Sequence, residues 1–284
     1  MQRVERILEI LRADGHHVTP LATQGEGTAS SIARECVQRR ADLILVAGGD
    51  GTINETANGM VHSDVPLGIL PVGTGNVLAT ELGLRGAAEV YAGQVAEWLP
   101  RRISAGLLLA DGGAVRRHFF MMAGVGFDAP IIQKVDPGLK QNVGVLSYWI
   151  AGLGELSREL DEFETLAGGL SRTCTFALAS RVRNYGGSVE IARHSGLLRD
   201  DFGLVLFEGR KTFRYLEYLA SALAGRLQET EGASILHAER AEFRPLGLEE
   251  VYVQVDGELA GRLPASVEIV PDALTLLTPP EFAG

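Results

Sequence analysis

The sequence predicts an α/β fold with an N-terminal parallel-sheet domain and a β-rich C-terminal domain. Two continuously apolar runs, residues 43–47 and 66–71, are typical of buried parallel strands, and helical patterns surround them. Each run ends in a glycine-rich turn. After Arg101 the segments become strand-like, with few helices between them. We therefore expect an α/β domain over residues 1–102 and a β-rich domain over residues 103–284.

The elements of the first domain alternate along the chain. Apolar residues at helical spacing predict a first helix over residues 4–11, which Asp14-Gly15 ends. The further predictions are a strand over 17–22, a helix over about 29–40, the strand 43–47, a helix that begins near Thr52 and covers 54–60, and the strand 66–71. Strands that alternate with helices in this way imply a parallel sheet.

The second domain is predicted to consist mainly of strands, over residues 106–110, 118–123, 172–180, 203–208 and 250–255. Helical patterns occur at 143–160 and 213–227. The second of these has an apolar stripe with Arg214 and Arg226 near its ends. Two interpretations stay open for both helices: packing on the strands, or an interfacial helix at a membrane surface.

Composition and charge limit the classes of function. The formal net charge of −10 argues against duplex nucleic acid as a partner, because no basic field would attract its phosphates. No apolar run reaches the ~18 residues that a membrane span needs, and the first residues do not resemble a signal peptide. Cys36 and Cys174 have no metal-ligand spacing, so a reduced cytoplasmic setting is expected.

The first glycine turn is Gly48-Gly49-Asp50-Gly51-Thr52, between a predicted strand and a predicted helix. Glycines let backbone N–H groups converge on an anion, and a helix N-terminus adds partial positive charge. Asp50 would repel a phosphate, so we expect it either on a bridging Mg²⁺ or as an orienting carboxylate. The alternative is a plain strand-to-helix turn with Thr52 as a helix cap.

A second glycine turn, Gly73-Thr74-Gly75-Asn76, follows the next predicted strand. Parallel strands end at the same edge of their sheet, and ligands of open α/β folds bind at that edge. Two such turns at neighbouring strand ends favour a phosphate site over two unrelated turns.

Four motifs resemble those of the diacylglycerol kinase catalytic family, which includes bacterial lipid kinases and sphingosine kinases and is distantly related to NAD kinases. They are GGDGTINETANG at 48–59, PLGILPVGTGNVLATELGL at 66–84, AGVGFDA at 123–129 and VDGE at 255–258. The resemblance implies a nucleotide cleft between an α/β domain and a β-sandwich. It also implies an ATP-dependent kinase that phosphorylates the hydroxyl of a diacylglycerol-like lipid. Open alternatives are a sphingoid-base or polyol kinase and an inactive nucleotide-binding regulator.

The resemblance also implies roles for individual residues, with Mg²⁺ neutralising the phosphates. Glu258 of the DGE motif would be the general base toward the lipid hydroxyl. Without the resemblance, Asp256-Gly257-Glu258 would be interpreted as a hairpin turn. ATP would contact Thr23, Gly48, Gly49, Asp50, Gly51, Thr52, Ile53, Asn54 and Thr74.

Residues 195–203 resemble a loop that holds a structural Mg²⁺ in bacterial members of the family. The matching ligands would be the carbonyl groups of Leu198 and Gly203 and the carboxylate of Asp201. The sequence departs from the family at Phe202, where glycine is usual, and at Val77, where aspartate is frequent. An ordinary solvated acidic turn is the alternative to the metal site.

The start of the chain also departs from the family, whose members open with a strand and an Asn-Pro turn. Here Met1 falls inside the first predicted helix, so we expect the natural chain to be longer and the first domain to lack its first strand here. The expected partner is a lipid substrate at a membrane surface. The expected location is the cytoplasm, with peripheral attachment to the inner membrane surface as an open alternative, and a homodimer is left open.

Overall fold

The computed structural model describes residues 2–126, 159–185 and 189–284. The chain forms two compact units, Met1–Ser104 with Pro271–Gly284, and Ala105–Val270. Residues from 271 onward were expected in the second domain but group with the first unit, because the last strand pairs there: Leu276 lies opposite Leu67. The strands β3 (Leu99–Ala110) and β16 (Ala265–Thr278) each contribute residues to both units.

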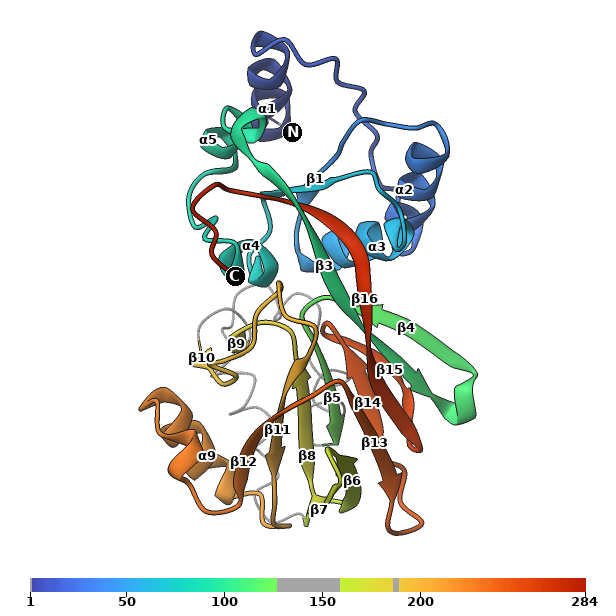
Figure 1. The fold of residues 1–284 in the computed structure, drawn as a ribbon, viewed down its shortest axis with the longest axis vertical. Coiled ribbons are helices and arrows are strands. Elements are labelled where there is room, and N and C mark those ends of the chain that lie inside the picture. Colours follow the sequence, from blue (N-terminus) through green and yellow to red (C-terminus); the bar gives the residue numbers. More distant parts are fainter. Residues whose placement is uncertain (1, 127–158, 186–188) are drawn as a thin grey trace. The chain divides into compact units, whose positions relative to one another are not determined.

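The first unit contains the predicted parallel sheet (Figure 1). Its other elements are α1 (Gln2–Ala13), α2 (Thr28–Gln38), β1 (Ile44–Gly48), α3 (Asp50–Met60), β2 (Leu67–Pro71), α4 (Val77–Glu81), α5 (Ala88–Ala92) and a 3-10 turn at Val95–Glu97. Strands β1 and β2 pair in parallel, from Ile44 opposite Leu67 to Gly48 opposite Pro71. The pairing of β2 with β16 is also parallel.

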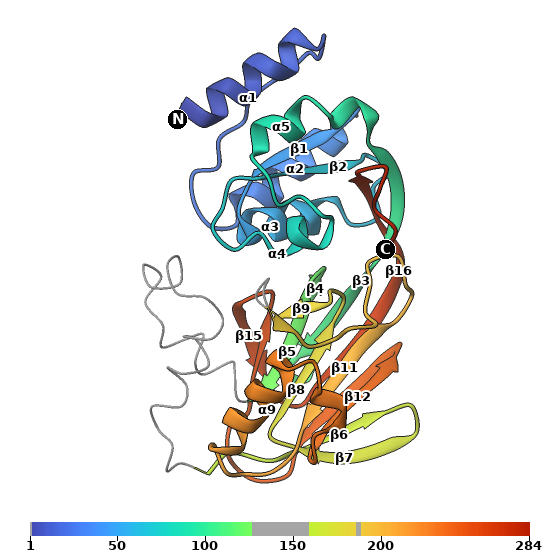
Figure 2. The ribbon, with the colours of Figure 1, turned by 90° about the vertical axis from the view of Figure 1, so that its left-hand side faces the viewer.

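Helices cover both faces of this sheet. Figures 1 and 2 show α3 and α4 on one face of β1 and β2 and α5 on the other. In α3 the apolar residues Ile53, Ala57 and Met60 recur at i, i+4 and i+7 and are at most 1% exposed. This stripe anchors α3, so its first turn is held at the end of β1.

Two local predictions for the first unit are wrong. Residues 17–22 form no strand: most of their side chains are exposed, and Pro20 has no N–H to donate to a ladder. Helix α3 begins at Asp50, not near Thr52, because Gly49 with φ −93° and ψ −178° is already the extended residue that precedes a helix. Asp50 and Gly51 therefore belong to the first turn of the helix.

The second unit is a β-sandwich with two mainly antiparallel layers, as predicted. One layer has the order β12-β11-β8-β5-β14-β15, and the other contains β7, β6, β13, β4 and the parts of β16 and β3 in this unit. The bounds are β4 (Val115–Phe119), β5 (Met122–Gly126), β6 (Phe163–Ala167), β7 (Leu170–Cys174), β8 (Phe176–Ser180), β9 (Asn184–Tyr185), β10 (Val189–Glu190), β11 (Phe202–Phe207), β12 (Ala233–Ala238), β13 (Arg240–Pro245), β14 (Tyr252–Val255), β15 (Glu258–Arg262), α9 (Arg214–Leu223) and 3-10 turns at Asp111–Gly113 and Leu227–Glu229.

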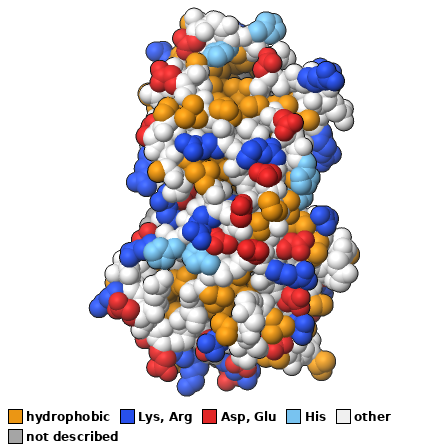
Figure 3. All heavy atoms as spheres, in the orientation of Figure 1, with side chains coloured by type: hydrophobic (Ala, Val, Ile, Leu, Met, Phe, Trp, Pro, Cys, Tyr) orange, Lys and Arg blue, Asp and Glu red, His pale blue; other side chains and the backbone are white. Residues whose placement is uncertain are grey.

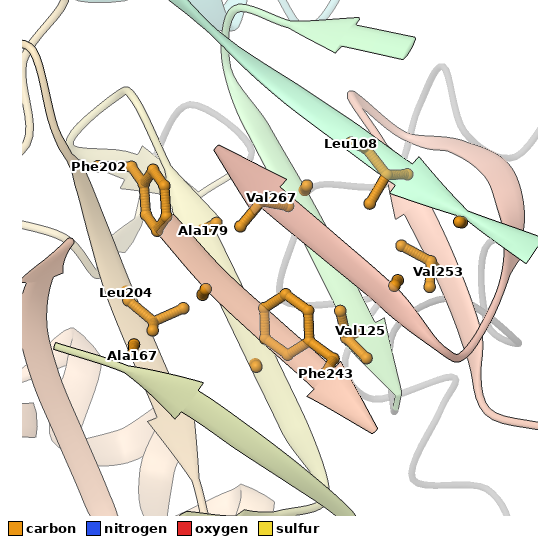
Figure 4. Packing of buried hydrophobic residues seen from close by; sticks show 14 of the residues in the cluster. Leu108, Val125, Ala167, Ala179, Phe202, Leu204, Phe243, Val253 and Val267 are labelled. Carbon is orange, nitrogen blue, oxygen red and sulfur yellow. The ribbon is translucent and has the colours of Figure 1, made fainter. Parts of the chain in front are cut away.

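The core of the sandwich lies between the two layers. Figure 4 shows Phe202 and Leu204 of one layer and Phe243 and Val267 of the other among the clustered side chains. All four are at most 1% exposed. Burial of such side chains from two sheets is the main stabilising term in a sandwich.

The strand expected over residues 172–180 of the second unit is divided at Thr175. The Oγ1 atom of Thr175 lies 2.8 Å from the Tyr215 hydroxyl and donates to Gly209 O at 3.1 Å. The helical pattern at 143–160 lies outside the described residues, apart from its last two positions. There, Glu159 forms an isolated antiparallel bridge with Lys211.

Charged side chains of both signs are mixed on the face shown in Figure 3. Lys and Arg are interspersed with Asp and Glu there, so this face has no basic field. Within the described part of the chain, no helix is long and apolar enough to cross a membrane.

Candidate functional site

The two glycine turns lie in backbone contact at the carboxyl ends of β1 and β2. Gly48 ends β1, and Gly73 follows the end of β2. A Cβ atom built on Gly73 would lie 2.5 Å from the Cα atom of Gly49, which is closer than any side chain tolerates. A Cβ on Gly48 would similarly lie 2.8 Å from the Cβ of Thr52. Glycine is therefore required at both positions, and the turns form one surface.

The first turn of α3 supplies the hydrogen-bond donors of this surface. Ile53 N donates to Gly49 O at 3.0 Å, which closes the first turn. The N–H groups of Asp50, Gly51 and Thr52 precede that bond, so they have no acceptor within the helix. A helix N-terminus with such N–H groups binds anions, and phosphate above all.

Asp50 joins the two turns. Its Oδ1 accepts a hydrogen bond from Val77 N at 2.7 Å, at the start of α4. A Cβ on Gly75 would lie 2.7 Å from its Oδ2. Burial raises the pKa of Asp50, and the N–H groups at the start of α4, with Val77 first, partly offset the rise. Asp50 thereby holds the start of α4 against the first turn of α3.

Asn76 leaves a polar atom unsatisfied beside the second turn. Its Nδ2 donates to Gly73 O at 2.6 Å, and its backbone has a left-handed φ of 50°. Its Oδ1 is buried and has no hydrogen-bond partner among the described residues. A buried amide oxygen of this kind is normally bonded, so a bound group or water fits here.

Glu55 is a positioning residue that was not predicted from the sequence. Its Oε1 accepts from Gly27 N at 2.8 Å and its Oε2 from Ala29 N at 3.1 Å. Glu55 of α3 thereby fixes the start of α2 and the exposed loop that contains Thr23. The signal was available, since Glu55 lies within the motif that begins at Gly48.

The predicted nucleotide residues therefore fall into different environments. Gly48, Gly49, Asp50, Gly51 and Thr52 come together at the first turn, and exposed Thr74 lies in the adjoining second turn. Thr23 lies in the exposed loop before α2. Ile53 and Asn54 are buried within α3, and Asn58 Nδ2 donates to Asn54 Oδ1 at 2.9 Å. Ile53 and Asn54 thus contribute by holding α3 in place more readily than by direct contact with a nucleotide.

The Asp-Gly-Glu motif of the second unit forms a two-residue hairpin turn between β14 and β15. Asp256 and Gly257 both have positive φ, 48° and 88°, as the tight turns of hairpins require. The Asp256 carboxylate accepts hydrogen bonds from Phe120 N, Met121 N and Met122 N at 2.7–3.2 Å. Asp256 therefore anchors the hairpin to the β4–β5 junction, a role that was not predicted from the sequence.

Glu258 follows this turn as the first residue of β15. Its Oε2 lies 2.6 Å from Nη2 of Arg117 on the neighbouring β4, and its side chain is 36% exposed. The ion pair fixes the direction of the carboxylate while leaving part of it open to a ligand. Arg117 was not predicted, because nothing in the local sequence links it to a residue far along the chain.

A guanidinium and an imidazole ring lie against the Asp201 carboxylate of the expected metal loop. Arg199 donates to both carboxylate oxygens of Asp201, at 2.7 Å from Nε and 2.5 Å from Nη2. Nδ1 of His237 lies 3.3 Å from Asp201 Oδ2. Gly203 lies in β11, opposite Ser180 and His237, and Leu198 precedes that strand. In the described part of the chain, no three His, Cys, Asp or Glu side chains are grouped so as to hold a metal.

Helix α9 has apolar side chains on two sides. Tyr215, Tyr218 and Leu219 are buried against the sandwich, with Tyr218 hydroxyl donating to Glu208 O at 2.7 Å. Phe213, which precedes the helix, and Leu216 and Leu223 are 55%, 46% and 59% exposed. Packing on the strands therefore accounts for the buried side of α9 and does not account for its exposed apolar side.

Known proteins are similar to both parts of the chain. The family profile described as "Diacylglycerol kinase catalytic domain" matches residues 1–108, and that described as "YegS C-terminal NAD kinase beta sandwich-like domain" matches residues 122–278. A diacylglycerol kinase of Mycobacterium tuberculosis is 28% identical, covering 96% of this chain and 85% of that protein. A diacylglycerol kinase of Bacillus subtilis (strain 168) is also 28% identical, with 93% and 86% covered.

Solved structures show the same fold. The crystal structure of a diacylglycerol kinase from Bacillus anthracis has a TM-score of 0.73 and 18% identity, covering 99% of this chain and 92% of that one. Yeast NADH kinase, solved with NADH, has a TM-score of 0.54 and 12% identity, with 97% and 79% covered.

Proposed function

Because the chain belongs to the diacylglycerol kinase family of lipid kinases, we propose that it transfers the γ-phosphate of ATP to the hydroxyl of a diacylglycerol-like lipid. The observation that carries the proposal is the backbone contact between the two glycine turns at the ends of β1 and β2. This contact produces one surface of N–H donors at a helix N-terminus, which suits the phosphates of a nucleotide.

In this proposal the first unit holds the nucleotide. The N–H groups of Asp50, Gly51 and Thr52 bind phosphate oxygens, and Thr74 adds its hydroxyl from the second turn. Asp50 keeps the turns in register through its bond to Val77 N. Mg²⁺, bound with ATP, supplies charge neutralisation of the phosphates.

Glu258 is the proposed general base. Its carboxylate accepts the proton of the lipid hydroxyl as the oxygen attacks the γ-phosphorus and ADP leaves. Arg117 holds one carboxylate oxygen, so the other faces the acceptor in a fixed direction. Asp256 positions the turn that carries Glu258 and does not itself take the proton.

The acceptor is a membrane lipid, so the enzyme must meet a bilayer surface. The exposed side of α9, formed by Phe213, Leu216 and Leu223, is the proposed contact. Lys211 lies next to it, with Nζ 5.9 Å from the Phe213 ring centroid, and Arg210 and Arg226 flank the helix. Apolar side chains bordered by cations favour an anionic bilayer surface.

The test is phosphate transfer from radiolabelled Mg-ATP to a panel of extracted lipids by the purified full chain. We expect label in the organic phase, and a loss of about 100-fold or more in rate for Glu258→Gln with ATP affinity retained. Glu268→Gln is the matched control, since Glu268 is 35% exposed and paired with Arg240 at 3.6 Å. Label in no lipid, or full activity of Glu258→Gln, would contradict the proposal.

A further inference from the structure

A fully buried arginine lies under the loop that resembles a metal site. Arg181 follows β8 and has 0% exposure. Its Nη2 donates to Leu197 O at 2.8 Å, and its Nη1 donates to Asp201 O. The backbone N–H of Arg181 donates to Met121 O at 2.8 Å, which holds the backbone to the sheet. A buried cation must be compensated, and here the backbone oxygens of residues 197–201 compensate it.

The arrangement resembles the ligation of a metal ion, with the guanidinium at the centre. Hard divalent cations bind carbonyl and carboxylate oxygens arranged around a point. Here the loop turns its Leu197 and Asp201 carbonyl groups toward one cation that belongs to the chain. Burial lowers the pKa of Arg181 to about 10, so the side chain remains positive at neutral pH, with Asp201 and Asp200 favouring the charge.

The carboxylate expected to bind metal is also occupied. Both oxygens of Asp201 accept from Arg199, and His237 approaches one of them at 3.3 Å. These contacts lower the pKa of Asp201, the Arg199 hydrogen bond first and His237 next among the favourable charges. A divalent ion here would have to displace Arg199 and would face the positive charge of Arg181.

The end of the loop is held by packing. Phe202 has 0% exposure and joins the sandwich core (Figure 4). Gly203 pairs on both sides within the sheet, and a Cβ there would overlap Ser195 Oγ. The backbone at 202–203 is thus fixed by the core and by the ladder.

We propose that the guanidinium of Arg181 is the internal cation that orders residues 195–203, and that this loop takes no structural Mg²⁺. The residues present differ from the resemblance in their bonding: the expected Asp201 carboxylate is bonded to Arg199, Gly203 lies within the ladder of β11, and the loop turns its Leu197 and Asp201 carbonyl groups to Arg181. The ordering of this loop by Arg181 is part of the folding of the second unit and does not depend on the nucleotide or the acceptor.

The first test uses the wild-type chain freed of nucleotide. Mn²⁺ titration followed by electron paramagnetic resonance reports divalent binding, and thermal unfolding is measured with EDTA or with millimolar Mg²⁺. We expect the same melting temperature in both solutions and no Mn²⁺ site that Asp201→Asn removes. An Asp201-dependent site, or a melting temperature that EDTA lowers, would overturn the proposal.

The second test replaces the internal cation. Arg181→Met should lower the melting temperature by on the order of 5–10 °C and expose residues 195–203 to proteolysis, because the carbonyl groups of Leu197 and Asp201 lose their donor. Arg181→Lys, which keeps the charge, should recover part of the loss. Arg199→Gln is the control at an exposed cation and should shift the temperature by less. An unchanged melting temperature for Arg181→Met would count against the role, and if that variant does not fold, the wild-type metal test still decides.

Discussion

The Asp50 side chain connects two turns that are distant in sequence. It lies in the first turn of α3, and its hydrogen bond goes to Val77 N at the start of α4. A buried carboxylate has a cost that such a bond only partly offsets, which is why its pKa is raised. At this position the unfavourable burial of the carboxylate is therefore only partly offset by its hydrogen bonds.

This raised pKa predicts how stability depends on pH. The folded state binds the Asp50 proton more tightly than the unfolded state, so the contribution of Asp50 to the unfolding free energy falls as pH rises from 3.8 through the folded pKa. Asp50→Asn keeps an oxygen for Val77 N and removes the titration. We expect its unfolding free energy, relative to wild type, to increase between about pH 4 and pH 7. Urea unfolding at both pH values measures this, and a difference that shrinks would contradict it.

Residue roles were predictable only where the local pattern shows them. The turns at glycines 48, 49 and 73 were recognisable, because an apolar strand that runs directly into several glycines usually ends in a tight turn. Asp256, Arg117 and Arg181 were not assigned, since their partners lie far away in the sequence. A single sequence does not show such pairings.

At the scale of elements, α9 is a helix whose exposed apolar side invites a direct test. Replacing Phe213 and Leu216 by serine should reduce co-sedimentation with anionic vesicles by several-fold, because exposed apolar area drives interfacial binding. The melting temperature should change little, since both side chains are largely outside the core. Leu170→Ser on β7 is the control, with a side chain 52% exposed in the same unit. Equal losses for the two variants would argue against a specific contact.

Elements with a clear hydrophobic pattern were predicted well, and elements whose formation depends on distant partners were not. The apolar runs at 43–47 and 66–71 became β1 and β2. Residues 17–22 have strand-like composition but gain no ladder, and the predicted strand 172–180 is interrupted because Thr175 bonds to Gly209 O and the Tyr215 hydroxyl. At Thr175 tertiary hydrogen bonding decides against local propensity, whereas residues 17–22 are mostly exposed and include Pro20, which has no N–H to donate.

At the scale of the whole molecule, the return of the chain to the first unit was not predicted. Residues 271–278 complete β16 there, and Arg102 of β3 secures them, donating to Thr275 Oγ1 at 2.9 Å, to Ser63 O at 3.0 Å and to Asp272 O. Nothing in the local pattern of the last residues indicates which unit they join. The change after Arg101 from alternating strands and helices to mainly strands predicted the two-part architecture but not this connection.

These bonds predict that Arg102→Met weakens the attachment of the last strand. We expect a loss of about 1–3 kcal/mol in the stability of the first unit and faster hydrogen exchange at residues 272–278. Hydrogen exchange with mass spectrometry measures the second effect. Arg116→Met, at an exposed position of β4, is the control. Exchange that is unchanged in Arg102→Met would show that the strand is held by other contacts.

The proposed function depends above all on the binding of ATP phosphates by the paired glycine turns. Gly49→Ala tests this without breaking the turns, because a Cβ there lies 3.5 Å from Gly73 Cα, which is an ordinary contact. The added methyl group would occupy the space between the two turns, where the proposed function places a phosphate. Gly247→Ala, whose Cβ meets only Glu249 N at 4.0 Å, is the control. In calorimetric titration with Mg-ATP, wild type and Gly247→Ala should bind alike and Gly49→Ala about 10-fold or more weakly. Absent binding to the folded wild type, or equal binding by Gly49→Ala, would contradict phosphate binding at these turns.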